Sequence, residues 1–196
     1  MTSVGEVNAM IESPLMFSHF LLRQCVREGD VVVDGTTGHG HDTVLMAELV
    51  GSEGQVLGFD IQAEAIESTR ARVTAAGLES RVTLYQESHE HAVSRLAEGQ
   101  QIGAVQFNLG YLPGGDKGVV TQGSSTLRCL EGLLPRLRKG GMAIFVIYHG
   151  HTGGPEERDA LLAFAAGLDQ KVYTVLRYDM LNWRNDPPFL IAIEKR

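Results

Sequence analysis

The sequence predicts an α/β fold in which a parallel sheet is closed by an antiparallel hairpin, and two observations support this class. Short runs of β-branched and other apolar residues alternate with longer helical patterns, which is typical of a doubly wound parallel sheet. The last two strand-like runs are separated only by a polar loop at residues 182–188. Because so short a loop cannot form a parallel crossover, these two strands are expected to be antiparallel.

The elements of the first half can be placed in order. Three consecutive valines followed by Asp34 predict a buried strand at residues 31–34. A helix is expected at 42–50, because Asp42 near its start is favoured by the helix dipole. A second strand at 55–60 is followed by a helix at 63–76, for which Gly77 is a typical C-terminal stop. A third strand is expected at 81–85.

The second half continues the alternation and then changes. We expect strands at 103–108 and 142–148, with a helix at 124–138 and a turn at 139–141 between them. A helix at 156–167 precedes the strand-like runs 171–179 and 189–194. Five parallel strands with a terminal antiparallel hairpin form the class I S-adenosylmethionine (SAM)-dependent methyltransferase fold, a Rossmann-like fold, and distinguish it from a dinucleotide-binding fold.

Length and composition fit one cytoplasmic domain spanning residues 1–196. At about 100–200 residues per domain, the 196 residues leave no room for a second core. A net charge of -7 argues against broad nonspecific binding to nucleic acid. No apolar run reaches the roughly 18 residues needed to span a bilayer, and the first residues lack the apolar stretch of a signal peptide. Cys25 and Cys129, both in helix-like stretches, are expected to be buried, reduced thiols.

A glycine-rich loop follows the first predicted strand at residues 34–43. Glycine lets the backbone turn tightly and approach a ligand, and the next helix points free N–H groups at whatever is bound. Asp60 ends the second strand, where a carboxylate can accept both hydroxyls of a ribose. These features fit NAD or SAM. A dinucleotide motif would need glycine in place of Thr43, and Asp34 would put an anion beside the pyrophosphate, so SAM is favoured.

The fourth predicted strand ends in Asn108-Leu109-Gly110-Tyr111, which resembles the Asn-Pro-Pro-Tyr signature of amino-group methyltransferases. Methyl transfer is an in-line displacement, so the attacking nitrogen must aim its lone pair at the methyl carbon. An Asn side-chain carbonyl and the next backbone carbonyl can accept two N–H groups and fix that aim. The aromatic ring can stack on a planar substrate. The alternative is that Asn108 merely caps a strand.

An aliphatic amine, with a pKa of about 10 by analogy with lysine, must lose a proton before it can attack. Asp116 is the nearest candidate base, followed by His149 and His151, and Lys117 can meet a phosphate. Asp116 and Lys117 can equally be solvated loop charges.

Six of the seven histidines form three His-x-His pairs, each after a predicted parallel strand: His39/His41, His89/His91 and His149/His151. They are expected to crowd the binding edge of the sheet. No metal site is predicted, because no cysteine joins them and no HExxH motif occurs. Trp183 is either a core residue or a base-stacking platform, and the polarity of its loop favours a position at the rim.

Taken together, these residues are similar to a family of small SAM-dependent methyltransferases first described as rRNA methylases, whose members act on the aminomethyl group of the modified (aminomethyl-thiouridine) wobble uridine in bacterial tRNA. The likeness runs in order through most of the chain, and Asn108 to Lys117 is its most distinctive part. Gly35, His39 and His149 depart from the family pattern. The stretches that carry the likeness are residues 33–43, 58–62, 107–117, 148–154 and 182–194.

The resemblance implies a set of site residues. SAM would be bound by Asp34, Gly38, Gly40, His41, Asp42, Thr43, Asp60, Ile61, Gln62, Ser88, His89 and Asn108. Catalysis would involve Asn108, Tyr111 and Asp116. The substrate would meet Gly110, Lys117, His149, His151, Arg184 and Asn185.

The residues therefore predict an amino-group methyltransferase, and the resemblance adds the aminomethyl group of a wobble uridine in a tRNA anticodon loop as its target. The alternatives are a SAM-dependent methyltransferase of rRNA or of a small-molecule or protein amine, a SAM-binding regulator without turnover, and a nicotinamide-dependent oxidoreductase. For tRNA binding, Arg23, Arg27, Lys117 and Arg184 should form one basic face. A homodimer, in which a second subunit holds the tRNA stem, is also expected.

Overall fold

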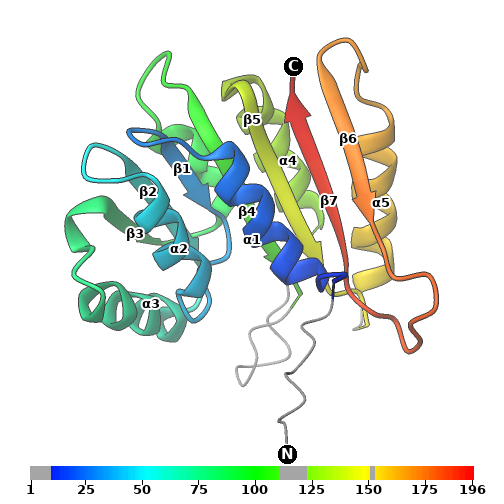
Figure 1. The fold of residues 1–196 in the computed structure, drawn as a ribbon, viewed down its shortest axis with the longest axis horizontal. Coiled ribbons are helices and arrows are strands. Elements are labelled where there is room, and N and C mark those ends of the chain that lie inside the picture. The colour runs from blue at the N-terminus through cyan, green and yellow to red at the C-terminus, as the bar shows by residue number, and fades with distance from the viewer. Residues whose placement is uncertain (1–9, 111–122, 151–152) are drawn as a thin grey trace, which may run out of the picture.

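Seven strands form one sheet in the order β3-β2-β1-β4-β5-β7-β6. The structure, a computed structural model, describes residues 10–110, 123–150 and 153–196 (Figure 1). Neighbouring strands among β1–β5 are parallel, whereas β7 runs antiparallel to both β5 and β6. The predicted fold class is therefore confirmed. The strands are β1 (Val31–Asp34), β2 (Gln55–Asp60), β3 (Val82–Gln86), β4 (Ile102–Leu109), β5 (Leu137–Ile147), β6 (Tyr173–Tyr178) and β7 (Phe189–Lys195).

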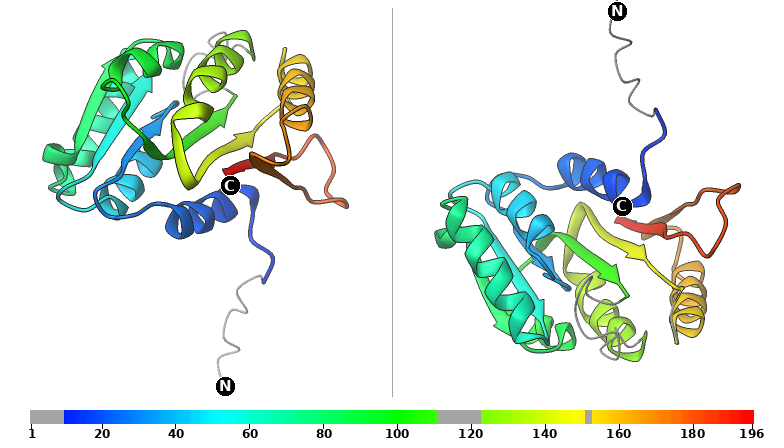
Figure 2. Two further views of the ribbon diagram at one scale, coloured as in Figure 1. Left: turned by 90° about the horizontal axis from the view of Figure 1, so that it is seen from above. Right: turned by 90° about the horizontal axis from the view of Figure 1, so that it is seen from below.

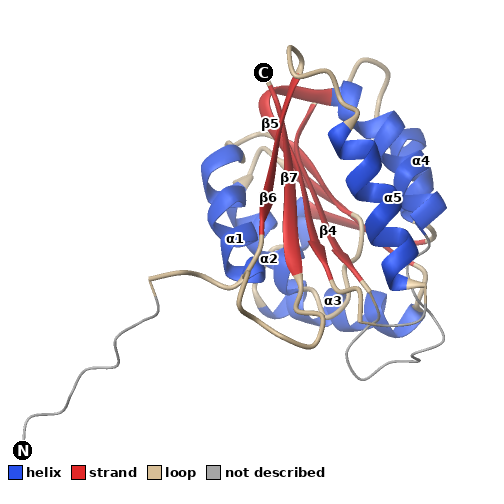
Figure 3. Ribbon diagram, turned by 90° about the vertical axis from the view of Figure 1, so that its right-hand side faces the viewer, coloured by secondary structure: helices blue, strands red, loops and turns tan. Residues whose placement is uncertain are grey.

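Helices cover both faces of the sheet, as Figures 2 and 3 show. One face carries α1 (Pro14–Cys25), α2 (His41–Leu49) and α3 (Ala63–Ala75), whose apolar residues join Val32 and Ile144 in one core. The other face carries α4 (Gly123–Leu133) and α5 (Gly154–Ala166), packed over a second core that contains Phe107 and Phe145. Short 3-10 helices lie at Glu79–Arg81, His89–Arg95 and Leu134–Arg136.

Helix α1 comes before the first strand and was predicted only in part. Ser13 caps its start by accepting a hydrogen bond from Met16 N at 3.2 Å, and Pro14 suits the first turn, where an N–H is not needed. At its other end, the guanidinium of Arg138 bonds the Cys25 carbonyl at 2.5 Å and the Asp30 carboxylate at 2.6 Å. The helix is thus tied to the beginning of β5.

The helix expected at 124–138 and the turn at 139–141 were wrong in part. The helix ends at Leu133, a 3-10 turn containing Pro135 follows, and β5 begins at Leu137, five residues before the expected start at Met142. Proline lacks the N–H that would continue the helical hydrogen bonds. The two glycines of the expected turn lie inside β5, where Gly140 has φ +74° and the register against β4 shifts. The remaining predicted boundaries fall within two residues of the observed ones.

Both cysteines are buried and neither forms a disulfide, as predicted. Burial raises the pKa of each thiol to about 12, which keeps both protonated. Trp183 is 49 % exposed on the β6–β7 loop, which confirms the rim position. Among the residues that the structure describes, no helix is long and apolar enough to cross a membrane.

Candidate active site

The carboxyl ends of β1, β2 and β4 bring three groups of predicted site residues together at one edge of the sheet, the lower edge in Figure 1. In parallel strands these ends are where open α/β sheets bind ligands. The first group is the loop between β1 and α2, the second is Asp60 at the end of β2, and the third is Asn108 near the end of β4.

Asp34 supports the β1–α2 loop from below. Its side chain is fully buried, and its two oxygens accept hydrogen bonds from Thr43 Oγ1 at 2.6 Å and Thr36 N at 3.2 Å. Burial, followed by the nearby charge of Asp42, raises the pKa of Asp34 to about 7. Asp34 therefore shapes the loop and presents no surface of its own to a ligand.

Two glycines allow this loop to lie close to the sheet. A Cβ on Gly35 would stand 2.1 Å from the ring of Phe107, and Gly40 has φ +80° at the start of α2. The Gly35 N–H donates to the Gln106 carbonyl at 2.9 Å, and Thr37 N donates to the Phe59 carbonyl at 3.0 Å. The loop is therefore fastened to β4 on one side and to β2 on the other.

Asp60 is held by backbone N–H groups from two loops. Gly38 N donates to one carboxylate oxygen at 3.1 Å, and Gln62 N donates to the other at 3.0 Å. Burial raises the pKa of Asp60, and these hydrogen bonds oppose the shift. Ile61, beside it, is 54 % exposed. A fixed carboxylate next to an exposed apolar side chain can accept ribose hydroxyls and cover a flat base.

Asn108 is oriented by the carboxylate of Asp42, which lies in the first turn of α2. Its Nδ2 donates to Asp42 Oδ2 at 2.6 Å, while its backbone N–H donates to Thr36 Oγ1 at 2.7 Å. Burial alone would raise the pKa of Asp42, but hydrogen bonds from His19 and Asn108 outweigh it and lower the pKa. Because an ionised carboxylate only accepts hydrogen bonds, the amide nitrogen must face Asp42 and Oδ1 must face away.

Among the residues that the structure describes, two buried oxygens at this edge have no hydrogen-bond partner, Thr37 Oγ1 and Asn108 Oδ1. Buried polar atoms are nearly always hydrogen-bonded, so atoms left without partners at a strand end indicate places for a ligand. The polar atoms, the glycine loop and the fixed carboxylate of Asp60 suit a nucleoside joined to an amino acid. The arrangement therefore fits SAM.

His89 is a buried histidine that packs against Phe107. It is 7 % exposed and stands edge-on to Phe107, with ring centroids 5.2 Å apart. Burial lowers its pKa to about 4, although a hydrogen bond to the Gly35 backbone opposes the shift, so the ring is neutral at pH 7. Its Nε2 also has no partner within residues 10–110, 123–150 and 153–196. Ser88, just before it, accepts from Glu90 N and begins the 3-10 helix.

The Leu109 carbonyl, next to Asn108, takes part in the β4–β5 pairing. Tyr148 N donates to it at 2.9 Å, and a carbonyl oxygen has two lone pairs. Gly110 follows with φ +150°, and a Cβ there would approach Tyr148 Cβ at 3.1 Å. The chain thus turns sharply at the residue where the sequence has glycine in place of proline.

Several predicted site residues lie elsewhere or outside the described part of the chain. Four of them lie outside the described residues: Tyr111, Asp116, Lys117 and His151. Arg184 and Asn185 are exposed on the loop between β6 and β7, and Asn185 and Asp186 both have positive φ. That loop reaches the carboxyl end of β5, since Phe189 pairs with Ile147 and a Cβ on Gly150 would stand 3.7 Å from Asp186 Cβ. His149 tilts against the ring of Phe189.

The three described arginines of the expected basic face do not lie together, and Lys117 lies outside the described residues. Arg27 follows α1 at the amino end of the sheet, where its guanidinium is 3.8 Å from the Cβ position of Gly140, whereas Arg184 belongs to the carboxyl end. Arg27 and Arg184 therefore lie at opposite ends of the sheet. Arg23, near the end of α1, lies at the same end as Arg27. Of the described histidines, His39 and His41 are exposed while His89 is buried, and no described group of three His, Cys, Asp or Glu is placed to hold a metal.

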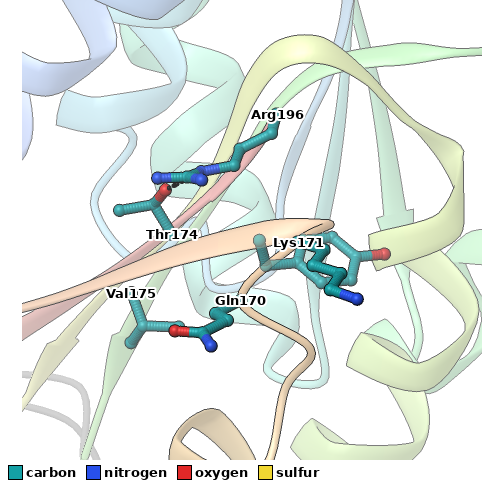
Figure 4. Close-up of a pocket in the computed structure, with 6 residues that line it drawn as sticks. Gln170, Lys171, Thr174, Val175 and Arg196 are labelled. Carbon is teal, nitrogen blue, oxygen red and sulfur yellow. Dashed lines mark hydrogen bonds between the residues drawn. The ribbon is translucent and has the colours of Figure 1, made fainter.

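The pocket in Figure 4, of about 390 Å³, is remote from this edge. It lies at the beginning of β6, where Tyr173 pairs with Lys195 near the amino end of β5. It is therefore not part of the candidate site. Its lining residues are Gln170, Lys171, Tyr173, Thr174, Val175 and Arg196.

The sequence reasoning missed three contributors to the site, His19, Thr36 and Tyr148. His19 bonds Asp42 from α1, and Thr36 receives the backbone N–H of Asn108. Tyr148, 38 % exposed, lies close enough to Asp42 for that charge, after burial, to raise its pKa. The only available signal for His19 was that it is the one histidine outside the His-x-His pairs.

Comparison with known proteins gives a consistent set of relatives. The family model described as "Putative rRNA methylase" matches residues 56–194, and a model for protein-L-isoaspartate O-methyltransferases matches residues 2–98. The Arabidopsis thaliana protein named "tRNA (mnm(5)s(2)U34)-methyltransferase, chloroplastic" is 36% identical over 187 residues, which cover 91% of this chain and 68% of that protein.

Solved structures of methyltransferases are also similar to this chain. A "putative rRNA-methylase" from Clostridium thermocellum superposes with a TM-score of 0.92 at 41% identity, covering 96% of this chain and 100% of that one. A "putative methyltransferase" from Streptococcus mutans, in complex with S-adenosylhomocysteine (SAH), superposes with a TM-score of 0.87 at 36% identity, covering 95% and 100%. An O-methyltransferase from Thermotoga maritima, at 17% identity and a TM-score of 0.64, shares the fold.

Proposed function

The chain belongs to the family described as "Putative rRNA methylase" and is a SAM-dependent methyltransferase, and on this premise we propose that it methylates the aminomethyl nitrogen of the modified wobble uridine in tRNA. The plant relative, whose printed name gives this position of tRNA, supports the substrate. The proposal rests on the amide of Asn108, which is fixed by Asp42 and whose oxygen has no partner among the described residues.

Bound SAM supplies an electrophilic methyl group on a sulfonium. We propose that Asp60 receives the ribose hydroxyls, while Gly38 and Gln62 hold that carboxylate in place. Ile61, Ser88 and His89 would surround the adenine. The amino acid end of SAM would be lined by Gly40, His41, Asp42 and Thr43. Asp34 would act only through the loop that it supports.

Asn108 would orient the substrate amine. Its Oδ1 would accept one N–H of the neutral amine, and the second lone pair of the Leu109 carbonyl would accept the other, which directs the nitrogen lone pair toward the methyl group. As the new bond forms, positive charge develops on the nitrogen. Oδ1 then stabilises that charge, because a preorganised dipole costs no reorganisation at the moment of reaction.

The remaining substrate contacts are assigned from the resemblance. Tyr111 would stack on the uracil, and Asp116 would take the amine proton, with His149 and His151 as the other candidate bases. Gly110 leaves room for the base beside Tyr148. Lys117, Arg184 and Asn185 would contact the backbone of the anticodon loop, and the exposed Trp183 adds a surface on which a base can stack.

The test is transfer of a tritiated methyl group from SAM to total tRNA from cells that lack this protein and from cells that have it. Label should enter only the deficient tRNA and should map to a wobble uridine. Label that instead enters ribosomal RNA or an extract of small amines would contradict the tRNA substrate. No transfer to any acceptor, with SAH still raising the thermal midpoint, would favour a SAM-binding regulator.

A homodimer and a single domain over residues 1–196 are also part of the proposal. A domain of this size covers one anticodon loop, and a second copy would supply surface for the stem. Sedimentation at assay concentrations should show two copies per particle, and a monomer that retains full activity would exclude the dimer.

A further inference from the structure

A histidine from α1 reaches the carboxylate that orients Asn108. His19 Nε2 and Asp42 Oδ1 are 2.7 Å apart, and the other oxygen of Asp42 accepts Asn108 Nδ2 at 2.6 Å. Because an ionised carboxylate only accepts hydrogen bonds, His19 must carry its proton on Nε2. The three side chains form a continuous network from α1, through the first turn of α2, to the end of β4, which we call the His19–Asp42–Asn108 network.

Resting on the function proposed above, we propose that His19 is a positioning residue for the methyl transfer. By holding one oxygen of Asp42, it fixes the other where it captures the Asn108 amide nitrogen. The amide oxygen is thereby directed toward the substrate amine. His19 does not touch substrate or SAM in this role, and its effect passes through Asp42.

Burial makes this contact difficult to replace with water. The side chain of Asp42 is 7% exposed and that of His19 is 20% exposed, so a carboxylate that loses His19 gains little solvent in exchange. Hydrogen bonds to charged groups are stronger than those between neutral groups. Without His19, Asp42 is free to rotate toward another donor, and the Asn108 amide loses its fixed partner.

Helix α1 does not depend on this contact for its own placement. Its apolar face, with Leu21, Leu22 and Cys25 buried, packs on the sheet, and Arg138 bonds the carbonyl at its end. The Ser13 cap holds the other end. Removing the imidazole should therefore leave the helix in place and disturb the network alone.

Three variants separate positioning from folding. His19→Ala removes the donor, and His19→Gln restores an N–H close to the position of Nε2. Gln24→Ala is the matched control, because Gln24 is exposed on the same helix. Each is assayed for kcat with deficient tRNA, for SAH affinity by calorimetry and for thermal midpoint. The side-chain amide signal of Asn108 is followed by ¹⁵N NMR, assigned by its absence from Asn108→Ala.

We expect His19→Ala to lower kcat by about ten- to a hundredfold with SAH affinity within about threefold of wild type. Its Asn108 amide protons should move upfield, because the hydrogen bond to Asp42 weakens. His19→Gln should recover most of both changes, and Gln24→Ala should match wild type.

An unchanged Asn108 amide signal in His19→Ala would overturn the positioning role, as would a loss of kcat that His19→Gln does not recover. The amide signal needs neither tRNA nor SAM. If the wild-type protein transfers no methyl group to tRNA, the proposed function fails, and a shifted amide signal still establishes the network.

Discussion

Asn108 and Asp42, 66 residues apart in the chain, meet through a hydrogen bond of 2.6 Å between the amide nitrogen and one carboxylate oxygen. The amide oxygen on the other side is buried and has no partner in the described part of the chain. One contact thus decides which end of the amide faces away from Asp42 and, in the proposed function, toward the substrate amine.

Replacing Asn108 with alanine should strongly reduce turnover and spare cofactor binding. Loss of one preorganised hydrogen-bonding group at a reacting centre costs about 10²–10³ in kcat. SAH affinity, measured by calorimetry, should stay within a few fold, because the residues around Asp60 are unchanged. Unaltered function of the variant in cells would instead favour a regulator without turnover.

Asp60→Ala should show the opposite pattern. Removing a carboxylate held by Gly38 N and Gln62 N should weaken SAM binding by about ten- to a hundredfold, since a lost charged hydrogen bond costs about 1.5–3 kcal/mol. At saturating SAM, kcat should change little. Glu64→Ala, an exposed carboxylate in the first turn of α3, serves as control. Equal SAM affinity in both variants would remove Asp60 from the cofactor site.

Gly35→Ala should destabilise the protein by steric conflict. The added Cβ would lie 2.1 Å from the Phe107 ring, and overpacking of this kind costs about 1–3 kcal/mol. Urea unfolding should show the loss. Phe107→Leu in the same chain removes the ring edge, so the double variant should lose less than the sum of the single changes. Strict additivity would show that the two residues do not meet.

Glu157→Gln should stabilise the protein only at higher pH. Burial raises the pKa of Glu157 to about 7, against a hydrogen bond from Thr126 that lowers it. The folded state therefore keeps a proton that the unfolded state releases above pH ~4.5. The stability from this group is present below that pH and is lost as pH rises through about 7.

The amide of the variant accepts the same Thr126 hydrogen bond without a charge. Denaturant unfolding should give values close to wild type near pH ~5 and a gain of about 1–3 kcal/mol near pH ~8. The exposed neighbour Glu156→Gln should track wild type at both values. A gain of equal size at the two pH values would contradict a buried, titrating Glu157.

Much of the fold could be predicted from the sequence, because the pattern of apolar residues and the glycines and short loops between elements indicated the same boundaries. The valine run of β1 and the Gly77 stop of α3 placed their elements within a residue, and the short loop before β7 gave the antiparallel hairpin. The two glycines after Arg138 misled the prediction, because a turn and a bulge use the same residues. Only pairing with β4 distinguishes them.

The site was predictable where it follows strand ends and less so where it depends on packing. Asp60 and Asn108 could be predicted because they lie at or near the carboxyl ends of β2 and β4. His19 does not, because its link to Asp42 joins a helix before the first strand to the start of α2. No local pattern encodes that contact. The supporting role of Asp34 could not be predicted either. An aspartate at a strand end gives the same sequence pattern whether it supports a loop or contacts a ligand.

The order of the strands also has a kinetic consequence. Among the described strands, β6 is at the edge of the sheet and pairs with β7 alone, and β7 lies between it and β5. During synthesis, the segment that forms β6 therefore has no partner until the following strand has left the ribosome. Pairings between distant segments, such as Val33 with Val105, slow folding further. Nascent chains arrested before residue 189 should carry an unpaired, chaperone-accessible strand that disappears once Phe189–Lys195 is added.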